Sequence, residues 1–411
     1  MKPGYKQTEV GVIPEEWEVK PLAAIADKIM VGIASAATHA YRLKGVPMFR
    51  NQNIKVGFLD DRDLLFVAPE YEVVFKNKRL REGDLLTMRT GYPGVTAIVP
   101  ARYDSAQSFT TLITRPRQQE AESAYLCHFI NSDCGQRFFI QSQIGGAQKN
   151  VNVGTLRKMP ILLPKPTEQR AIATALSDVD GLLGGLDRLI AKKRDLKQAA
   201  MQQLLTGQTR LPGFHAEWEV KTFGEVAVTQ RERIDPRTAC VHDFCIELEH
   251  IESGSGQLLG STSTGAQSSL KSVFNPGDVL FGKLRAYLRK YWRATRHGVC
   301  STEIWVLVPR VDAAMSEFLF QIVQTEGFID ATSNSYGTHM PRSDWNAVQN
   351  YKLPMPPLPE QAAIASVLTE MDGELAALTQ RREKTRALKQ AMMQELLTGR
   401  IRLVASLGAT E

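Results

Sequence analysis

A long internal repeat constrains the fold of this chain more than any other feature. The segment that begins at Glu168, EQRAIATALSDVDGLLGGLDRLIAKKRDLKQAAMQQLLTGQTRL, recurs from Glu360 as EQAAIASVLTEMDGELAALTQRREKTRALKQAMMQELLTGRIRL. Aligned without a gap, 24 of the 44 positions are identical, and LKQAxMQxLLTG is almost intact in both copies. A duplication of this length fixes the architecture, because both copies are expected to adopt the same structure.

Weaker repeats accompany the long one. Three short motifs occur twice: Glu-Trp-Glu-Val-Lys at 16–20 and 217–221, Gly-Asp with two apolar residues at 83–86 and 277–280, and a Pro-rich stretch at 160–166 and 354–359. The chain is therefore predicted to run as globular segment, long repeat, globular segment, long repeat. The long repeats have stayed alike while the globular segments have diverged, which indicates that both repeats meet one common requirement.

Both long repeats are predicted to be helices. Apolar residues recur at alternating steps of four and three from Ile172 to Ile190, and in the same register from Ile364 to Leu378, which is typical of a coiled coil. Interior glycines such as Gly181 and Gly373 cost a helix about 1 kcal/mol each, so we expect a close helix approach or a bend there. Packed antiparallel, the helices form a pseudo-two-fold coiled coil. Its seam leucines are Leu176, Leu183, Leu204, Leu368, Leu375 and Leu396.

The globular segments are predicted to be α+β domains. Short β-branched and apolar runs such as Val46–Phe49 and Ile304–Val308 indicate strands, and residues 125–140 and 315–324 have helical spacing. The predicted organisation is a first domain at 1–160, a first spacer helix at 161–210, a second domain at 211–352, and a second spacer helix with a C-terminal tail at 353–411.

Cations gather in the second globular segment. Seven Lys and Arg residues lie between Lys271 and Arg296, against the single acid Asp278, and three aromatic residues are interleaved. Such a stripe suits contact with phosphates and with base edges or sugars; a solvated strand face is the alternative. The candidate DNA-binding residues of the stripe are Lys283, Arg285, Tyr287 and Arg289.

Three polar loops supply the other candidates. Glycines allow the loop at 89–94 to approach a groove closely. The loops at 145–150 and 336–342 stand at equivalent distances before the long helices and carry Gln, Asn, Lys and Arg, which read base edges. Ordinary surface turns are the alternative for all three. The candidate DNA-binding residues of these loops are Arg89, Thr90, Tyr92, Gln148, Lys149, Asn150, Tyr336, Thr338, His339 and Arg342.

Composition and motifs exclude several classes of function. The net charge of +6 and the pI of about 9.0 permit a nucleic-acid partner without requiring one. No apolar run approaches the roughly 18 residues that span a bilayer, and the polar start lacks a signal-peptide core, so a cytoplasmic protein without a membrane partner is expected. No phosphate-binding loop, dinucleotide fingerprint or HExxH occurs. Catalytic residues are therefore not predicted.

A metal site is also not predicted. Cys240, Cys245 and His250 superficially suggest zinc, but their spacing fits no standard zinc motif, and packed thiols are the preferred interpretation.

Taken together, these motifs resemble the specificity (S) subunit of type I restriction–modification systems. The resemblance covers the whole chain and rests on YKQTEVGVIPEEWEV from Tyr5, on the Pro-rich EQxAIA segments at 164–173 and 356–365, and on LKQAxMQxLLTG in both helices. It implies that each globular domain is a target-recognition domain for one half of a split site in double-stranded DNA. It further implies that the helices set the spacing of the halves and dock two methyltransferase subunits, with restriction subunits joining a larger assembly.

The same resemblance implies a non-catalytic chain that binds no cofactor itself, because S-adenosylmethionine, ATP and Mg would belong to the partner subunits. Two other functions stay open from the sequence alone. One is a stand-alone DNA-binding scaffold or regulator with the same architecture, and the other is a hydrolase with an unrecognised site in a globular domain. Turnover by the purified chain would favour the hydrolase.

Overall fold

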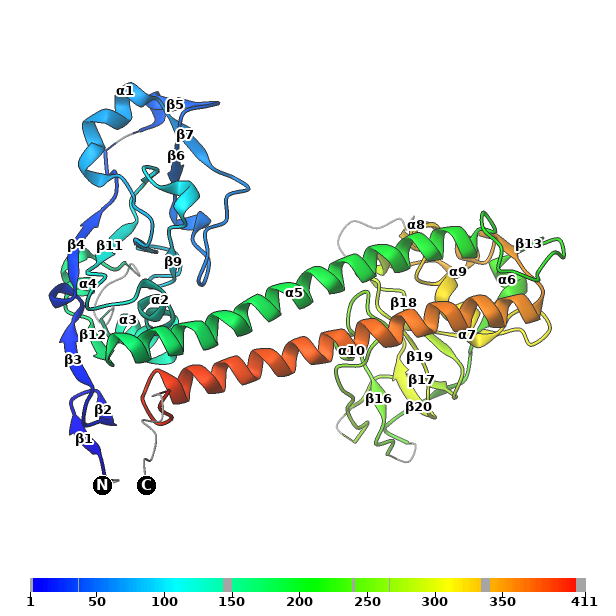
Figure 1. Cartoon of the computed structure of the whole chain (residues 1–411). Helices are drawn as coiled ribbons and strands as arrows, with labels where there is room; N and C mark the ends of the chain where they lie inside the picture. The colour runs from blue at the N-terminus through cyan, green and yellow to red at the C-terminus, as the bar shows by residue number, and fades with distance from the viewer. Residues whose placement is uncertain are drawn as a thin grey trace. The chain divides into compact units, whose positions relative to one another are not determined.

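The computed structural model describes residues 3–35, 37–142, 150–238, 241–265, 267–333 and 341–403. The chain divides into two compact units. Unit 1 comprises residues 1–186 together with 381–411, and unit 2 comprises residues 187–380. The long helices α5 (Pro166–Leu205) and α10 (Leu358–Leu396) each contribute to both units (Figure 1).

Unit 1 combines short strands with a few helices. The helices other than α5 and α10 are α1 (Pro69–Glu72), α2 (Ser123–Asn131), α3 (Asp133–Ser142) and α4 (Val153–Arg157). The strands are β1 (Tyr5–Thr8), β2 (Gly11–Pro14), β3 (Glu18–Pro21), β4 (Ala26–Val31), β5 (Tyr41–Arg42), β6 (Val46–Phe49), β7 (Leu65–Val67), β8 (Leu85–Thr87), β9 (Thr96–Ile98), β10 (Gln107–Ser108), β11 (Leu112–Pro116) and β12 (Pro160–Leu163).

Unit 2 has the same kind of content. Its shorter helices are α6 (Phe223–Val226), α7 (Ser316–Ile322), α8 (Glu326–Ser333) and α9 (Trp345–Val348). Its strands are β13 (Glu219–Thr222), β14 (Ala227–Thr229), β15 (Arg233–Ile234), β16 (Cys245–Ile246), β17 (Lys271–Phe274), β18 (Val279–Gly282), β19 (Tyr291–Arg293), β20 (Gly298–Ser301), β21 (Ile304–Pro309) and β22 (Lys352–Met355).

One four-stranded sheet has the same topology in both units. The strand order β4-β11-β8-β9 in unit 1 matches β14-β21-β18-β19 in unit 2, and a two-stranded pair, β12-β3 or β22-β13, precedes the long helix in each. The second four-stranded sheet differs, with order β10-β6-β7-β5 in unit 1 and β15-β17-β20-β16 in unit 2. The predicted α+β fold with two similar domains is confirmed, and the divergence lies mainly in the second sheet.

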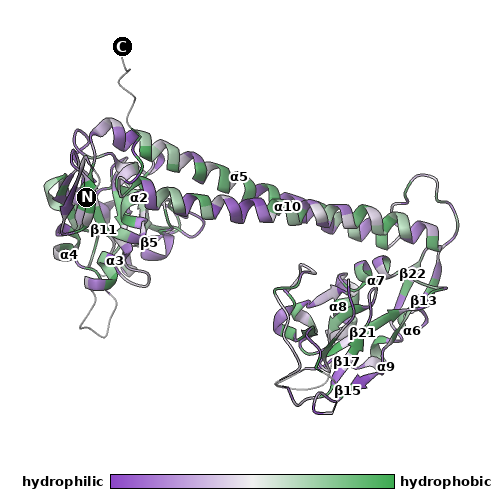
Figure 2. Ribbon diagram, turned by 90° about the horizontal axis from the view of Figure 1, so that it is seen from below, coloured by the Kyte–Doolittle hydropathy of each residue, from purple (hydrophilic) through white to green (hydrophobic). Residues whose placement is uncertain are grey.

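The two long helices pack against each other in antiparallel sense. Lys389 of α10 pairs with Asp180 of α5 at 2.6 Å in unit 1, and Lys197 of α5 pairs with Asp372 of α10 at 2.5 Å in unit 2. These two ion pairs occupy equivalent positions of the repeat. Figure 2 shows apolar and hydrophilic residues interspersed along both helices.

The seam leucines are buried to different degrees. Leu176 and Leu368 are fully buried, Leu204 and Leu396 nearly so, and Leu183 and Leu375 are half-buried. Leu176 and Leu396 belong to the core that also contains β12, α2 and α3, whereas Leu204 and Leu368 belong to the corresponding core of unit 2. Each helix end is therefore part of a globular core as well as of the helix pair.

A cluster that we call the clasp joins three separate segments in unit 1 and two in unit 2. In unit 1 the indole of Trp17 donates to Glu168 Oε2 at 3.1 Å, and the guanidinium of Arg402 donates to both oxygens of the same carboxylate at 2.7 and 2.9 Å. Glu168 is 2% exposed and stands in the first turn of α5. The clasp thus ties the residue just before β3 and the segment that follows α10 to the start of α5. The clasp of unit 2 consists of Trp218, Glu360 and Arg210.

Adjacent glutamines hold each domain on its helix. The amide of Gln169 donates to the carbonyls of Glu120 and Pro164, and its oxygen accepts from the backbone N–H of Glu122. Gln361 makes the same three kinds of bond in unit 2, to Ala313, Pro356 and Met315. Because these backbone groups would otherwise lack partners, the repeated Glu-Gln pair has a structural role inside the chain.

The structure modifies two expectations about the helices. Residues 125–140 are not one helix but two, α2 and α3, because Ser132 is extended and its hydroxyl accepts from the N–H of Gly135 as an N-cap would. The interior glycines do not serve close helix approach: a Cβ added at Gly181, Gly185 or Gly373 would have no atom within 4 Å. By contrast, Val46–Phe49 and Ile304–Val308 are strands as predicted.

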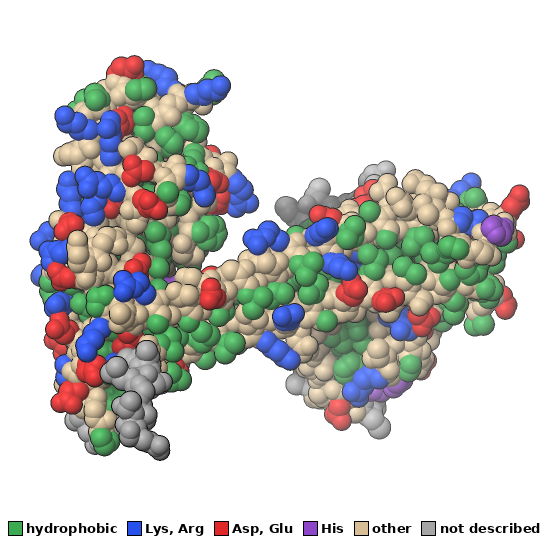
Figure 3. Space-filling view, viewed as in Figure 1, with side chains coloured by type: hydrophobic (Ala, Val, Ile, Leu, Met, Phe, Trp, Pro, Cys, Tyr) green, Lys and Arg blue, Asp and Glu red, His purple; other side chains and the backbone are tan. Residues whose placement is uncertain are grey.

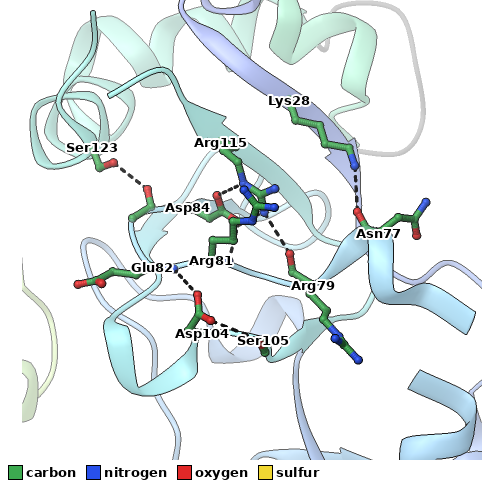
Figure 4. Close-up of polar contacts among 11 residues, drawn as sticks. Lys28, Asn77, Arg79, Arg81, Glu82, Asp84, Asp104, Ser105, Arg115 and Ser123 are labelled. Carbon is green, nitrogen blue, oxygen red and sulfur yellow. Dashed lines mark hydrogen bonds and ion pairs between the residues drawn. The ribbon is translucent and has the colours of Figure 1, made fainter. Parts of the chain in front are cut away.

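The repeated Gly-Asp motif stabilises the strand that leads to the candidate loop. In unit 1 the carboxylate of Asp84 accepts from the backbone N–H of Arg81 and from the guanidinium of Arg115 (Figure 4). In unit 2 the carboxylate of Asp278 accepts from the N–H of Asn275, and no Lys or Arg of the described part of the chain pairs with it. Burial therefore raises the pKa of Asp278.

This difference predicts unequal effects of the same substitution. Asp84→Asn should lower the free energy of unfolding by about 3 kcal/mol, because it leaves Arg115 without its carboxylate. Asp278→Asn should lower it by less than about 1 kcal/mol, since an amide oxygen can still accept the Asn275 bond. Denaturant unfolding of both variants measures the two values, and equal losses would contradict the assigned partners.

The raised pKa of Asp278 makes the stability of the fold depend on pH in a definite direction. Because the folded-state pKa of Asp278 lies above its unfolded value, the folded state binds the proton more tightly, and the associated stability decreases as the pH rises through that interval. Asp278→Asn should remove this decrease.

Candidate nucleic-acid interface

Two predicted loops of unit 1 meet at one surface. The backbone N–H of Val151 donates to the carbonyl of Arg89 at 3.0 Å, and Arg89 Nε donates to Asn150 Oδ1 at 3.0 Å. Thr90 and Asn150 form an antiparallel bridge. The loop between β8 and β9 is therefore joined to the segment that precedes α4, although about 60 residues separate the two in sequence. Gln148 and Lys149 lie outside the described residues.

Asn51 is a further member of this surface that the sequence analysis missed. Its oxygen accepts from the backbone N–H of Arg89 at 2.9 Å, and its amide donates to the hydroxyl of Thr90 at 3.3 Å. Asn51 belongs to a short 3-10 helix, η3 (Asn51–Asn53), that begins after β6. The polar run Arg50-Asn51-Gln52-Asn53 was the available signal, because amide side chains are typical readers of adenine.

The tip of the unit 1 loop is exposed. Tyr92 is 76% exposed, between Gly91 and Gly94, whose φ angles are 82° and 97°. Gly94 also lies against Phe139 of α3, where a Cβ would come within 2.3 Å of the ring. The loop thus presents an aromatic side chain to solvent while its base is fixed against α3.

Unit 2 repeats the arrangement at equivalent residues. Leu284 bridges Arg342 as Thr90 bridges Asn150, and the N–H of Ser343 donates to the carbonyl of Lys283 at 2.9 Å. The N–H of Arg285 also donates to the carbonyl of Pro341. Lys283 follows the Gly-Asp motif at the same distance as Arg89. Tyr336, Thr338 and His339 lie outside the described residues.

Much of the basic stripe in unit 2 is engaged inside the unit. Lys271 is 3% exposed and pairs with Glu247 at 2.8 Å, and Lys290 donates to two backbone carbonyls. Arg289 pairs with Glu326 and Arg342 with Glu303. The exposed Arg285 and the half-buried Lys283 have no side-chain partner among the described residues, so these two are the most available for a phosphate or a base.

The unit 2 loop has a strained backbone. Arg285 and Arg289 have φ angles of 54° and 51° on either side of the 3-10 helix η7 (Ala286–Leu288). Left-handed backbone costs a residue with a Cβ roughly 1–2 kcal/mol. The corresponding loop of unit 1 has glycines, Gly91 and Gly94, at its positive φ angles. Retaining arginine at strained positions is typical of residues kept for binding.

Charges of both signs cover unit 1. On the face shown in Figure 3, Lys and Arg side chains are interspersed with Asp and Glu. Near Asn51, Arg50 pairs with Asp63 at 2.9 Å, and Gln52 donates to the same carboxylate at 2.6 Å. A polyanion approaching this surface would therefore compete with carboxylates for the arginines.

The cysteines and histidine weighed for zinc have structural roles or lie outside the described residues. Cys245 is buried in β16, which raises the pKa of its thiol to about 11, and the ring of His250 accepts from the N–H of Glu247 at 3.0 Å. Cys240 is not described. Across the described ranges, no group of three or more His, Cys, Asp or Glu is placed to hold a metal ion.

Among the described residues, no helix has the length and apolar character needed to cross a bilayer.

Comparison with known proteins identifies the family. A profile described as the type I restriction modification DNA specificity domain matches residues 14–190 and, a second time, residues 216–386. The chain therefore belongs to the type I restriction–modification DNA specificity family, as a specificity subunit with two DNA specificity domains. The resemblance noted in the sequence is confirmed.

Individual relatives are distant but extensive. The putative type I restriction enzyme MjaX specificity subunit of Methanocaldococcus jannaschii is 24% identical over 440 residues, which cover 97% of each chain. The EcoDI specificity subunit of Escherichia coli is 25% identical over 248 residues, covering 52% of this chain and 55% of the relative. The solved type I S subunit of M. genitalium shares the fold, with a TM-score of 0.59, 14% identity and coverage of 96% and 99%.

The strained arginine gives a prediction that separates folding from binding. Arg285→Gly should raise the free energy of unfolding by about 1 kcal/mol, because glycine adopts the left-handed backbone without a Cβ clash. Arg285→Ala is the matched control, since it removes the same cation but keeps the strain. Thermal denaturation should show stabilisation only for the glycine variant, while both variants should bind DNA more weakly. A destabilised glycine variant would contradict the strained geometry.

Proposed function

We propose that each unit binds one half of a bipartite site in double-stranded DNA, and that α5 and α10 set the distance between the halves. The observation that carries this proposal is the recurrence of one loop pair at equivalent residues of two diverged domains. We assign target recognition to residues 1–160 and 211–352, and spacing to residues 161–210 and 353–411. The specific bases are read by the loops around Arg89 and Asn150 in unit 1 and around Lys283 and Arg342 in unit 2.

The long helices also carry a repeated surface that the chain itself does not cover. Leu196 and Leu388 are 48% and 57% exposed at equivalent positions. One helical face continues from each leucine through residues that are identical and exposed in both copies. We call this face the docking ridge; it comprises Lys192, Leu196 and Ala199 on α5 and Lys384, Leu388 and Ala391 on α10.

The docking ridge supports a partner that binds twice. The buried seam leucines and the clasps explain many identities between the repeats by contacts inside the chain, but they leave the docking ridge unexplained. An exposed leucine between a lysine and an alanine suits a helix of another protein. We therefore propose that two methyltransferase subunits dock here, one on each copy, and that restriction subunits join the resulting complex.

We infer further that the chain is not itself an enzyme and works in the cytoplasm. Membership of a specificity family and the lack of nucleotide, cofactor and metal motifs in the sequence support this. S-adenosylmethionine, ATP and Mg would then be bound by the partner subunits. Methyl transfer by the purified chain alone would contradict the proposal.

Half-site recognition can be tested with two equivalent substitutions. Arg89→Ala should relax only the half-site read by unit 1, and Lys283→Ala only the half-site read by unit 2, each by about 1–3 kcal/mol of discrimination. Arg170→Ala, on the exposed face of α5 and matching Ala362 of the second copy, is the control. Sequencing the methylated motifs of cells that carry each complex measures the outcome. A change in both halves, or in the gap between them, would contradict independent reading.

Docking can be tested by stoichiometry. Leu196→Glu and Leu388→Glu should each reduce the number of bound methyltransferase subunits from two to one, and the double variant should bind none, because a carboxylate cannot be buried without a partner. Leu182→Glu is the matched control: Leu182 is 45% exposed on the same helix, and the second copy already has Glu374 at this position. Native mass spectrometry counts the subunits. If the double variant still binds two methyltransferase subunits, these subunits dock on a surface other than the docking ridge.

A further inference from the structure

A hollow of about 590 Å³ lies in unit 1 between the α2–α3 corner and the end of α10. Its floor comes from α10 and the residues that follow it, and its wall comes from the stretch Asn131–Ile140. We call it the corner groove. The floor residues are Arg386, Lys389, Gln390, Met393, Gln394, Leu397, Thr398 and Arg400.

The floor of the corner groove is made almost entirely of repeated residues. Seven of its eight positions are identical in α5, and only Arg400 differs, as Gln208. Contacts inside the chain account for Lys389, which pairs with Asp180. No contact with another described residue accounts for the exposed side chains of Gln390 and Gln394, so these repeated side chains are available to a ligand outside the chain.

The chemistry of the corner groove indicates what it binds. Four cations line it against the single acid Asp133. Three of them pair with carboxylates inside the chain: Arg386 with Glu383, Lys389 with Asp180 and Arg400 with Glu395. Arg137 on the wall donates only to the backbone oxygen of Asp133 and to the sulfur of Cys134, so its charge has no carboxylate partner among the described residues. Met393 and Leu397 supply an apolar floor, and Ile140 is 66% exposed at the rim. This combination suits an acidic segment that also carries an apolar side chain.

The wall of the corner groove also holds the candidate DNA loop. Gln136 donates to the carbonyl of Gly94 at 3.3 Å, and Phe139 packs against the same glycine. Asn131 bonds both the N–H and the carbonyl of Thr96, at 3.0 and 2.8 Å. A ligand bound in the corner groove would therefore contact one side of α3. The loop that contains Tyr92 is attached to the opposite side of the same helix.

Unit 2 shows the same connection with different side chains. Lys197 of α5 donates to Gln324 at the α7–α8 corner at 3.0 Å. On α8, Glu326 pairs with Arg289 of the candidate loop, and the carbonyl of Thr332 accepts from Ser343. In both units, therefore, the corner between two short helices connects a long helix to the candidate DNA-binding loop.

We propose that the corner groove receives an acidic segment of the methyltransferase subunit, and that α3 couples this docking to the binding of DNA by the loop at 89–94. The inference rests on the proposed function, because it takes the methyltransferase as the partner that binds the repeated helix surface. Coupling of this kind is reciprocal: DNA strengthens docking by the same factor by which docking strengthens DNA binding.

The groove is tested by Arg137→Asp. Unit 2 has Asp330 at the equivalent position of α8, so the fold is expected to tolerate the change. The affinity of the methyltransferase subunit for the full chain at the unit 1 site should fall about tenfold, because an attraction becomes a repulsion, and the remaining affinity should depend less on salt. Arg170→Asp makes the same charge change outside the groove and should leave the affinity unaltered. Equal affinities for the two variants would overturn the groove assignment.

The coupling is tested by Gln136→Ala. In the unaltered chain, saturating methyltransferase should tighten the binding of a duplex that contains the target site. In Gln136→Ala the ratio of the two DNA dissociation constants should approach one, whereas Arg170→Asp should keep it. An unchanged ratio in Gln136→Ala would overturn the role of α3. Failure of the unaltered chain to bind methyltransferase at all would instead contradict the proposed function, so the two failures are distinguishable.

Discussion

A buried carboxylate at the start of each long helix holds the architecture together. Glu168 and Glu360 are almost completely buried, and each is neutralised by an arginine and hydrogen-bonded by an indole. Their place in the first helical turn adds a favourable interaction with the helix dipole. Three segments distant in sequence meet at Glu168 and two meet at Glu360, so the position of each domain on its helix pair is set by charge-assisted bonds as well as by apolar packing.

The repeat can now be divided by what its residues do. Glu, Gln, Asp and Lys at the clasp, at the domain attachment and at the interhelical ion pairs are identical in both copies because both units need the same internal contacts. A second group, represented by Leu196 and Leu388, is identical but exposed. Internal symmetry explains the first group, whereas we propose that the second reflects a partner that recognises the same surface twice.

The sequence allowed the larger features to be predicted because each rests on a periodic or repeated pattern. The helix pair follows from the spacing of leucines, and the correspondence of the loops at 145–150 and 336–342 follows from their equivalent distances to the helices. The meeting of the loops near Arg89 and Asn150 was not predicted, because no pattern in the sequence connects them. Asn51 could not be found in this way, since its contact with Arg89 depends on how β6 and β8 are brought together by the sheets.

Local charge was the least reliable signal. Composition cannot show whether a cation faces solvent or a carboxylate, and Lys271 proved to be buried against Glu247. The break at Ser132 could not be predicted either, since the apolar pattern continues on both sides of it. The break depends on a hydrogen bond of the Ser132 hydroxyl, which hydropathy does not reveal. Backbone strain at Arg285 has no sequence signature, since arginine is uncommon in left-handed backbone.

The glycines within the long helices have a mechanical consequence. Gly181 and Gly373 stand in open space a few residues before the points at which α5 and α10 pass from one unit to the other. Each weakens its helix by about 1 kcal/mol without gaining a contact, and local opening in proteins begins where such support is lowest. Each long helix is therefore expected to be stiffest at its clasped end and more compliant near its glycine.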